Sequence, residues 1–181
     1  MASQNSTERR GLLAIRLVIG VRVVLAGLFW LAFSRQLWCW SLFFVVAAFW
    51  TDILDGRLSR RYGVSAAGGY WDAIADFLFI TTVFSLFVCA GLYPWWMLAL
   101  TSAMFAQFVV SSGIKQPTYD PVGKYYGIFL FLASGATLLY PQPVLCRAVL
   151  MALVGLSAAT LTSRGLLFYR RHRRGKDYVN D

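Results

Sequence analysis

The sequence predicts an all-α integral membrane protein, a bundle of about six transmembrane helices in a single domain over residues 1–181. Three observations support this fold class. Hydrophobic residues make up 59% of the chain, charged residues make up only 14%, and the mean hydropathy is +0.60. Soluble domains carry about 25% charged residues. A membrane-spanning helix needs roughly 20 mostly apolar residues, so the chain has room for about six spans and no separate soluble domain.

The apolar segments follow one another in a regular order. Short turns at Ser34-Arg35, Gly91-Leu92 and Pro141-Gln142-Pro143 separate some of them, and longer links at 56–68 and 114–121 separate the others. The expected helices therefore cover 12–34, 36–55, 69–91, 93–113, 122–140 and 144–169, followed by a basic tail over 170–181. The first segment contains arginines and lacks a small-residue cleavage site, so we expect a retained helix rather than a signal peptide.

Aromatic and basic residues predict the orientation of the bundle. The ends joined by the short turns carry aromatic residues, as interfacial anchors do: Trp38, Trp40, Tyr93, Trp95, Trp96 and Tyr140. Most basic residues lie at the opposite end, which the excess of Lys and Arg in cytoplasmic loops predicts to be cytoplasmic. We expect a multi-pass protein of a plasma membrane such as the bacterial inner membrane, with both termini and the 56–68 link in the cytoplasm. The net charge of +9 suits anionic lipid headgroups, and nothing in its distribution indicates nucleic-acid binding.

Cysteine and histidine chemistry is excluded from the expected mechanism. The three cysteines show no C-x-x-C spacing, and the single histidine, His172, lies within the basic tail. The pattern of a zinc site or a disulfide framework is therefore missing from the sequence.

Acidic residues are the informative ones. The chain has eight, and four of them lie in or at the ends of the second and third apolar segments: Asp52, Asp55, Asp72 and Asp76. A carboxylate inside a membrane is costly unless it faces a cavity, a cation or a partner. Spacings of three and four residues place each pair on one face of its helix. Because both pairs flank the 56–68 link, we expect the four carboxylates to converge at the cytoplasmic end.

Clustered carboxylates repel one another unless cations neutralise them, and oxygen-only ligands suit magnesium, manganese or calcium. Gly56 and Gly68 allow close approach of the backbone, and Arg60 carries a guanidinium group suited to phosphate oxygens. Together these residues predict a metal-dependent phosphoryl-transfer site. The alternatives are a structural charge network or a cation transporter for the aspartates, and anchoring at the membrane surface for Arg60.

The residues also resemble a known family. The runs DILDGRLSR over 52–60 and GGYWDAIAD over 68–76 resemble the signature D-x2-D-G-x2-A-R-x8-G-x3-D-x3-D of the CDP-alcohol phosphotransferases, and the six-helix arrangement resembles that family over essentially the whole chain. Two departures concern the link, where Ser59 replaces the usual alanine and the spacing is one residue short. In addition, Phe77 follows the last aspartate where many phosphatidylglycerophosphate synthases carry lysine.

The resemblance implies a chemistry. Asp52, Asp55 and Asp72, with Asp76 contributing, would hold two Mg²⁺ or Mn²⁺ ions, and Asp76 would take the proton from an acceptor hydroxyl. The donor would be a CDP-linked lipid such as CDP-diacylglycerol, and attack on its β-phosphoryl group would release CMP. The acceptor is expected to be a small polar alcohol, first glycerol 3-phosphate, with inositol phosphate, inositol and serine left open. Members of the family are commonly homodimers.

Substrate contacts are expected from a further set of residues: Gly56, Ser59, Arg60, Gly68, Arg22 and Lys124. Arg22 resembles a first-helix arginine of the family and needs a partner, either an aspartate or a donor phosphate. Lys124 resembles the lysine of the Gly-Lys pair that opens the fifth helix, although a lysine there can also extend to the membrane surface. Lys115 and Arg164 are candidate ligands for an acceptor phosphate or solvated anchors.

Overall fold

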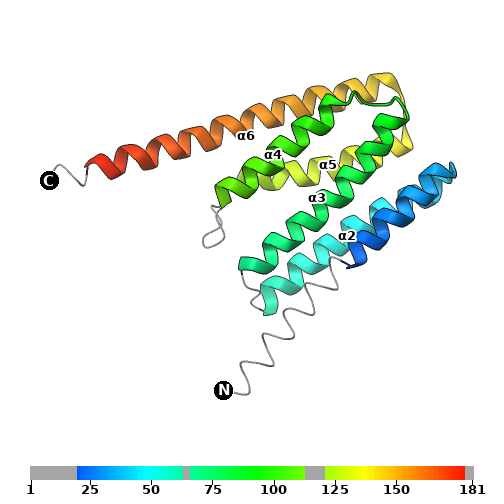
Figure 1. Ribbon diagram of the computed structural model, residues 1–181, viewed down its shortest axis with the longest axis horizontal. Helices are drawn as coiled ribbons and strands as arrows, with labels where there is room; N and C mark the ends of the chain where they lie inside the picture. Colours follow the sequence, from blue (N-terminus) through cyan, green and yellow to red (C-terminus); the bar gives the residue numbers. More distant parts are fainter. Residues whose placement is uncertain (1–19, 63–65, 113–120, 178–181) are drawn as a thin grey trace, which may run out of the picture.

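The chain is all-α in the computed structural model, which describes the backbone of residues 20–62, 66–112 and 121–177 and the side chains of 20–54, 71, 73–110 and 125–163. Over these residues there are six helices and no strand. The first helix is described from Gly20 to Ser34. It is followed by α2 (Trp38–Tyr62), α3 (Ala66–Cys89), α4 (Trp96–Ser112), α5 (Pro121–Leu139) and α6 (Pro143–Asp177) (Figure 1). The predicted all-α fold class is confirmed.

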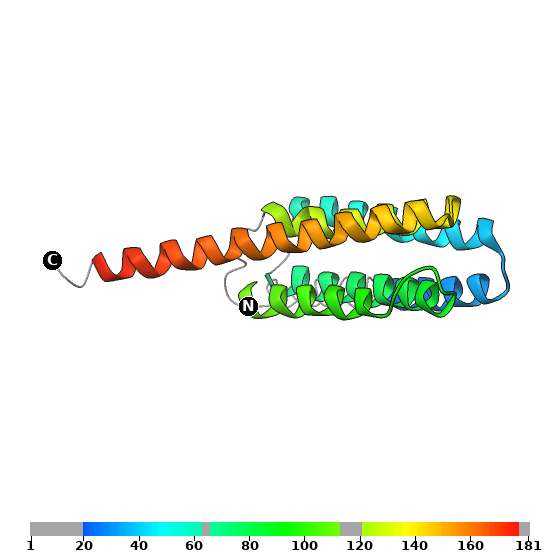
Figure 2. The same ribbon diagram turned by 90° about the horizontal axis from the view of Figure 1, so that it is seen from above.

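The helices pack in two layers. Figure 2 shows the first helix, α3 and α4 in one layer and α2, α5 and α6 in the other. Within the second layer α5 packs between α2 and α6, and α3 contacts both its neighbour α4 and α5 across the layers. Helix α6 extends past the rest of the bundle at the end where α4 stops (Figure 1).

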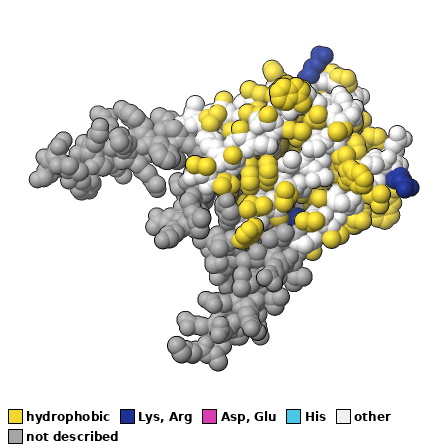
Figure 3. Space-filling model, viewed as in Figure 1, with side chains coloured by type: hydrophobic (Ala, Val, Ile, Leu, Met, Phe, Trp, Pro, Cys, Tyr) yellow, Lys and Arg dark blue, Asp and Glu magenta, His cyan; other side chains and the backbone are white. Residues whose placement is uncertain are grey.

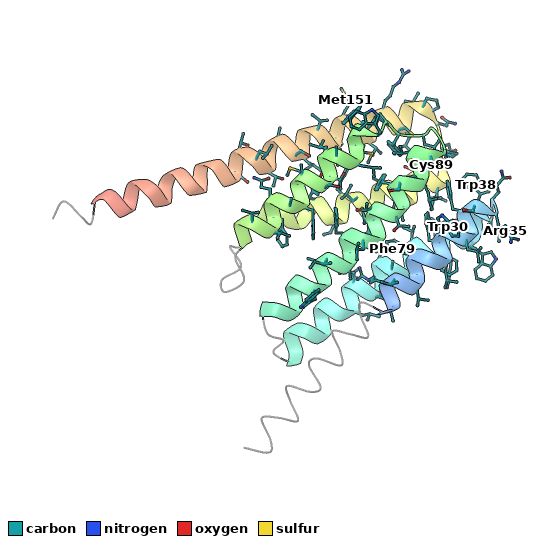
Figure 4. The ribbon with its side chains drawn as sticks, viewed as in Figure 1. Trp30, Arg35, Trp38, Phe79, Cys89 and Met151 are labelled. Carbon is teal, nitrogen blue, oxygen red and sulfur yellow. The ribbon has the colours of Figure 1, made fainter. Side chains whose placement is uncertain are left out.

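The predicted short turns are confirmed, and two of them have the hydrogen bonds of a Schellman helix ending. Gln36 and Gly91 adopt the left-handed conformation, with φ of 57° and 75°. The Leu37 amide donates to the Ala32 carbonyl and the Leu92 amide to the Phe87 carbonyl, each at 2.9 Å. We refer to this side of the molecule as the turn end. Figure 4 shows Trp30, Arg35 and Trp38 projecting there from the first helix, the turn and α2, with Cys89 at the end of α3.

The prediction of a long link over 56–68 is wrong. Helix α2 continues to Tyr62 and α3 begins at Ala66, so only 63–65 lie outside the described helices. The segment contains no proline, and its leucine and arginines are good helix formers that satisfy their backbone groups by continuing the helix. For the same reason α6 continues to Asp177, through most of the predicted basic tail.

Tyr93 differs from the predicted interfacial aromatic residue. The fourth helix begins at Trp96 rather than at residue 93, because Pro94 disfavours a helical backbone in the residue before it. Tyr93 is only 4% exposed, and its hydroxyl is 2.7 Å from that of Thr137 in α5. The tryptophans predicted to flank it, Trp95 and Trp96, are exposed.

An aromatic layer crosses the centre of the bundle and consists of Phe29, Phe49, Phe79 and Phe131. The ring centroid of Phe79 lies 6.2 Å from that of Phe29 and 5.9 Å from that of Phe131. Phe49 reaches Phe131 at 5.7 Å. Phe29 and Phe79 have no solvent exposure. These contacts join the first helix, α2, α3 and α5 by the offset and edge-to-face arrangements that aromatic rings prefer.

Among the described residues, one helical stretch, Pro143–Ser163, has the length and composition needed to cross a membrane. The remaining five helices contain apolar stretches of 10–17 residues. Large apolar side chains are exposed on several helices, including Trp30, Trp50, Leu132 and Met151.

Candidate functional site

Three charged side chains lie at the same depth in the bundle. Arg22 is 12 residues from the end of the first helix at the turn end, Asp52 is 14 residues from the start of α2, and Asp76 is 13 residues from the end of α3. At 1.5 Å per helical residue, each lies about 18–21 Å from the turn end. The helix lengths alone therefore bring the three residues to one level.

The side chains meet at the guanidinium group of Arg22. Its Nη2 donates to Asp52 Oδ1 at 3.3 Å, and its Nη1 forms an ion pair with Asp76 Oδ1. Arg22 is 1% exposed, whereas the Asp52 and Asp76 side chains are 33% and 25% exposed. Since Asp52 belongs to one layer and Arg22 and Asp76 to the other, this cluster connects the layers. Its cation is enclosed and its carboxylates are partly open.

The aromatic layer lies on the turn-end side of the cluster. Phe49 precedes Asp52 by three residues in α2, and Phe79 follows Asp76 by three residues in α3. Side chains three apart share a helix face, so each ring lies one turn nearer the turn end than its aspartate. Apolar rings therefore adjoin the two carboxylates on the turn-end side.

The remaining predicted site residues fall on helical backbone near the end opposite the turn end. Asp55, Gly56, Ser59 and Arg60 belong to the last turns of α2, Gly68 and Asp72 to the first turns of α3, and Lys124 to the first turn of α5. The expected helical spacing of both aspartate pairs is confirmed, since α2 and α3 are continuous through them. The side chains of these seven residues lie outside the described ones, and so does that of Arg164. Lys115 lies outside the described residues altogether. Their roles stay predictions.

A divalent cation suits the donor set. Asp52 and Asp76 are the acidic side chains within the described range. They contact one guanidinium group from two helices, so the positive charge of Arg22 already bridges them. Carboxylate oxygens are the ligands that Mg²⁺ and Mn²⁺ prefer. No group of three potential ligands occurs among the described side chains, and a complete site would need Asp55 or Asp72 from the next turn of the same helices.

Buried hydroxyl groups form a second polar set, which the sequence analysis did not identify. Tyr126 in α5 is 8% exposed, and its hydroxyl lies 3.4 Å from Ser157 Oγ of α6. The sequence signal for this hydroxyl set was the presence of serine and threonine inside apolar segments. Such residues satisfy themselves by bonding a carbonyl one turn earlier, so they do not indicate by themselves which helices they join.

Phe77, the departure next to Asp76, has a structural explanation. Its ring stacks on that of Phe105 in α4, with centroids 4.0 Å apart and an interplanar angle of 5°. The position after the last aspartate therefore contributes to packing between α3 and α4.

Comparison with known proteins agrees with this arrangement. A family model for the CDP-alcohol phosphatidyltransferases matches residues 12–161, most of the chain. The chain is also 33% identical over 97 residues to the CDP-diacylglycerol–glycerol-3-phosphate 3-phosphatidyltransferase of Blochmanniella floridana. That alignment covers 52% of this chain and 50% of the relative, so the chain spans about half the length of the relative it matches. The match of the family model across both aspartate pairs and the helices that bring them together shows that the chain belongs to the CDP-alcohol phosphatidyltransferase family.

Proposed function

We propose that this protein transfers a phosphatidyl group from CDP-diacylglycerol to a small hydroxyl acceptor and releases CMP. One observation carries the proposal. Asp52, from the first half of the family signature, and Asp76, from the second half, lie on different helices and contact the same guanidinium group. The two halves of the signature thus form one partly open, charged site with an apolar floor, which suits a substrate with a charged head and lipid chains.

The bundle is proposed to span a membrane. Helices α2 and α3 contain 25 and 24 residues, which at 1.5 Å per residue is about 36 Å, longer than the roughly 30 Å apolar core of a bilayer. Hydrophobic side chains cover much of the described surface in Figure 3, and dark-blue basic side chains appear on it at few points. An apolar surface of this extent is stable against lipid rather than water.

The site is proposed to face the cytoplasm. The carboxylates lie on the side of the aromatic layer that is nearer to the basic residues of the 56–62 stretch, and the positive-inside rule assigns that stretch to the cytoplasm. The turn end carries the exposed residues Trp38, Trp40 and Trp95, as an interfacial belt does. CDP-linked donors would present their nucleotide from the cytoplasm while their acyl chains stay among lipid.

The reaction follows from the residues at the site. Asp52, Asp55 and Asp72, with Asp76 contributing, would hold Mg²⁺ or Mn²⁺. When bound, the metal neutralises charge on the transferring phosphoryl group. Asp76 accepts the proton of the acceptor hydroxyl. The acceptor oxygen bonds to the phosphorus that carries diacylglycerol, the bond from this phosphorus to the bridging oxygen breaks, and CMP leaves with that oxygen and the electron pair.

Glycerol 3-phosphate is the acceptor we propose first. The relative from Blochmanniella floridana carries glycerol 3-phosphate in its name. Three basic residues are candidate ligands for such an acceptor: Lys115 between α4 and α5 in the sequence, Lys124 in the first turn of α5, and Arg164 in the second half of α6. A phosphorylated acceptor needs cations of this kind. Inositol phosphate, inositol and serine are the competing acceptors.

The test uses the full chain purified in detergent and supplied with CDP-diacylglycerol. CMP release should require an acceptor, be fastest with glycerol 3-phosphate, stop with excess chelator and return when Mg²⁺ or Mn²⁺ is added. CDP-diacylglycerol without acceptor is the control for hydrolysis. Preference for inositol phosphate, inositol or serine would change the acceptor but leave the transfer reaction in place. Unchanged turnover in chelator, with trace metal excluded, would contradict the metal site.

A further inference from the structure

Arg22 is the most buried charged group in the part of the chain that the structure describes. It is 1% exposed, and within that part Asp52 and Asp76 are its two ionic partners. Its Nε has no hydrogen-bond partner among the described residues. An arginine side chain carries a positive charge, and here this charge faces the two carboxylates.

This charge is paired with the carboxylates that would bind a metal. Arg22 contacts one oxygen of each, Asp52 Oδ1 and Asp76 Oδ1, so a cation bound by Asp52 and Asp76 would share both carboxylates with the guanidinium group. Two cations that share ligands repel each other, and the repulsion is strong where water is scarce. Conversely, removing one partner of a buried ion pair leaves an uncompensated charge, which is strongly destabilising.

We infer that Arg22 is a resident counter-cation, which holds Asp52 and Asp76 together in the metal-free protein and competes with the divalent metal for them. It is a positioning residue in this role. The inference rests on the metal site of the proposed function and extends it. Metal binding must draw the two carboxylates away from Arg22 or share them with it.

Competition predicts an unusual pair of effects from neutralising Arg22. In Arg22→Gln the carboxylates lose their counter-cation, so the metal-free protein should unfold at a temperature lower by about 10 °C. Because a repelling charge next to the metal ligands is gone, Mn²⁺ should bind at least about tenfold more tightly. A residue that merely orients the aspartates for metal would instead weaken Mn²⁺ binding when removed.

The experiment measures the Kd of Mn²⁺ by electron paramagnetic resonance, and thermal unfolding in chelator and in saturating Mn²⁺, on the full chain in detergent without nucleotide. Arg22→Gln is compared with Arg22→Lys, whose ammonium keeps the charge but cannot contact both carboxylates as a planar fork does, and should give a smaller gain in Mn²⁺ affinity. Arg35→Gln is the matched control, since Arg35 is an exposed arginine in the turn after the first helix. It should change neither quantity.

Each outcome decides the inference. Tighter Mn²⁺ binding by Arg22→Gln, or folding of this variant only when Mn²⁺ is present, supports it. Unchanged or weaker binding overturns it while leaving the metal site intact. If Arg22→Gln folds under neither condition, Arg22→Lys decides by the same criterion. Failure of the wild-type protein to bind Mn²⁺ overturns both the inference and the metal site, and CMP release, measured separately, reports on the transfer reaction.

Discussion

Two sets of buried polar groups connect the helices of this protein, and they do so by different chemistry. The charged cluster of Arg22, Asp52 and Asp76 joins the first helix, α2 and α3. The hydroxyl set connects the turn after α3 with α5, where Tyr93 meets Thr137 at 2.7 Å, and α5 with α6, where Tyr126 meets Ser157 at 3.4 Å. We call the parts of the bundle joined by these two sets the charged half and the hydroxyl half. The first set contains three formal charges, and the second contains none.

The difference shows which polar contacts serve packing. Thr137 and Ser157 also donate to the carbonyl groups of Ala133 and Leu153, at 2.7 and 2.8 Å, so these hydroxyls remain satisfied within their own helices. Such groups connect helices at little cost. A buried ion pair adds little net stability over an apolar replacement, so packing alone does not account for the charged cluster. We therefore propose that the charged half serves the chemistry and that the hydroxyl half serves assembly.

The largest expected effect tests the chemistry of the charged half. Asp76→Asn keeps the shape of the side chain but removes the base, so turnover should fall by about 10²–10⁴-fold while Mn²⁺ and CDP-diacylglycerol still bind. Asp52→Asn is the matched variant, because it removes the negative charge of the other carboxylate that faces Arg22, and it should weaken Mn²⁺ binding. Titration of Mn²⁺ and donor onto each folded variant must accompany kinetics, since KM need not equal a dissociation constant. Substantial turnover by Asp76→Asn would remove its assignment as base.

A smaller effect tests how far the chemistry extends along α2. Arg60→Ala should raise the KM for CDP-diacylglycerol about tenfold, the loss expected for one charge-assisted contact to phosphate. The neighbouring Ser59→Ala restores the alanine usual in the family and should leave KM and kcat nearly unchanged. Steady-state kinetics of both variants give the comparison. Normal kinetics for Arg60→Ala would make this arginine an anchor at the membrane surface.

The smallest effect tests the hydroxyl half. Tyr93→Phe removes the contact to Thr137, whose own bond to Ala133 remains, so the free energy of unfolding should fall by about 1 kcal/mol and the Tm by about 2–4 °C. Turnover measured near 25 °C should stay within about twofold, because the loss is small beside a typical folding free energy of about 5–15 kcal/mol. Tyr140→Phe is the control, since Tyr140 is 64% exposed and should change neither Tm nor turnover. A large loss of turnover in Tyr93→Phe at unchanged Tm would show that the hydroxyl half also takes part in the chemistry, which contradicts the proposed division of roles.

Sequence patterns predicted those parts of the molecule that depend on one segment at a time. Composition indicated an all-α chain, the short breaks at 34–35 and 91–92 marked helix ends, and the spacing of the aspartates placed each pair on one helix. Hydropathy did not predict that α2 reaches Tyr62, because a helix that leaves an apolar environment can continue through arginine and leucine. The last residue of an apolar segment and the last residue of its helix need not be the same.

Other features depend on which helices are neighbours, and no single segment specifies that. Arg22 required a partner on physical grounds, and the sequence offered an aspartate or a donor phosphate. The fold supplies two aspartates, because the first helix lies near both α2 and α3 at the same depth. Tyr93 looked like its tryptophan neighbours and became buried only because the turn after α3 directs it toward Thr137 of α5.

The aromatic layer has a consequence for the movement of substrates and products. If Phe29, Phe49, Phe79 and Phe131 close the site on the turn-end side of the carboxylates, the donor headgroup, the acceptor and CMP must all pass through the same opening. CMP then has to leave before the next nucleotide can enter, so it should act as a product inhibitor competitive with the donor. The new lipid also stays in the leaflet that supplied the old one. Under the proposed activity this protein changes the headgroup of a lipid without changing its side of the membrane, and equalising the two leaflets is left to other machinery.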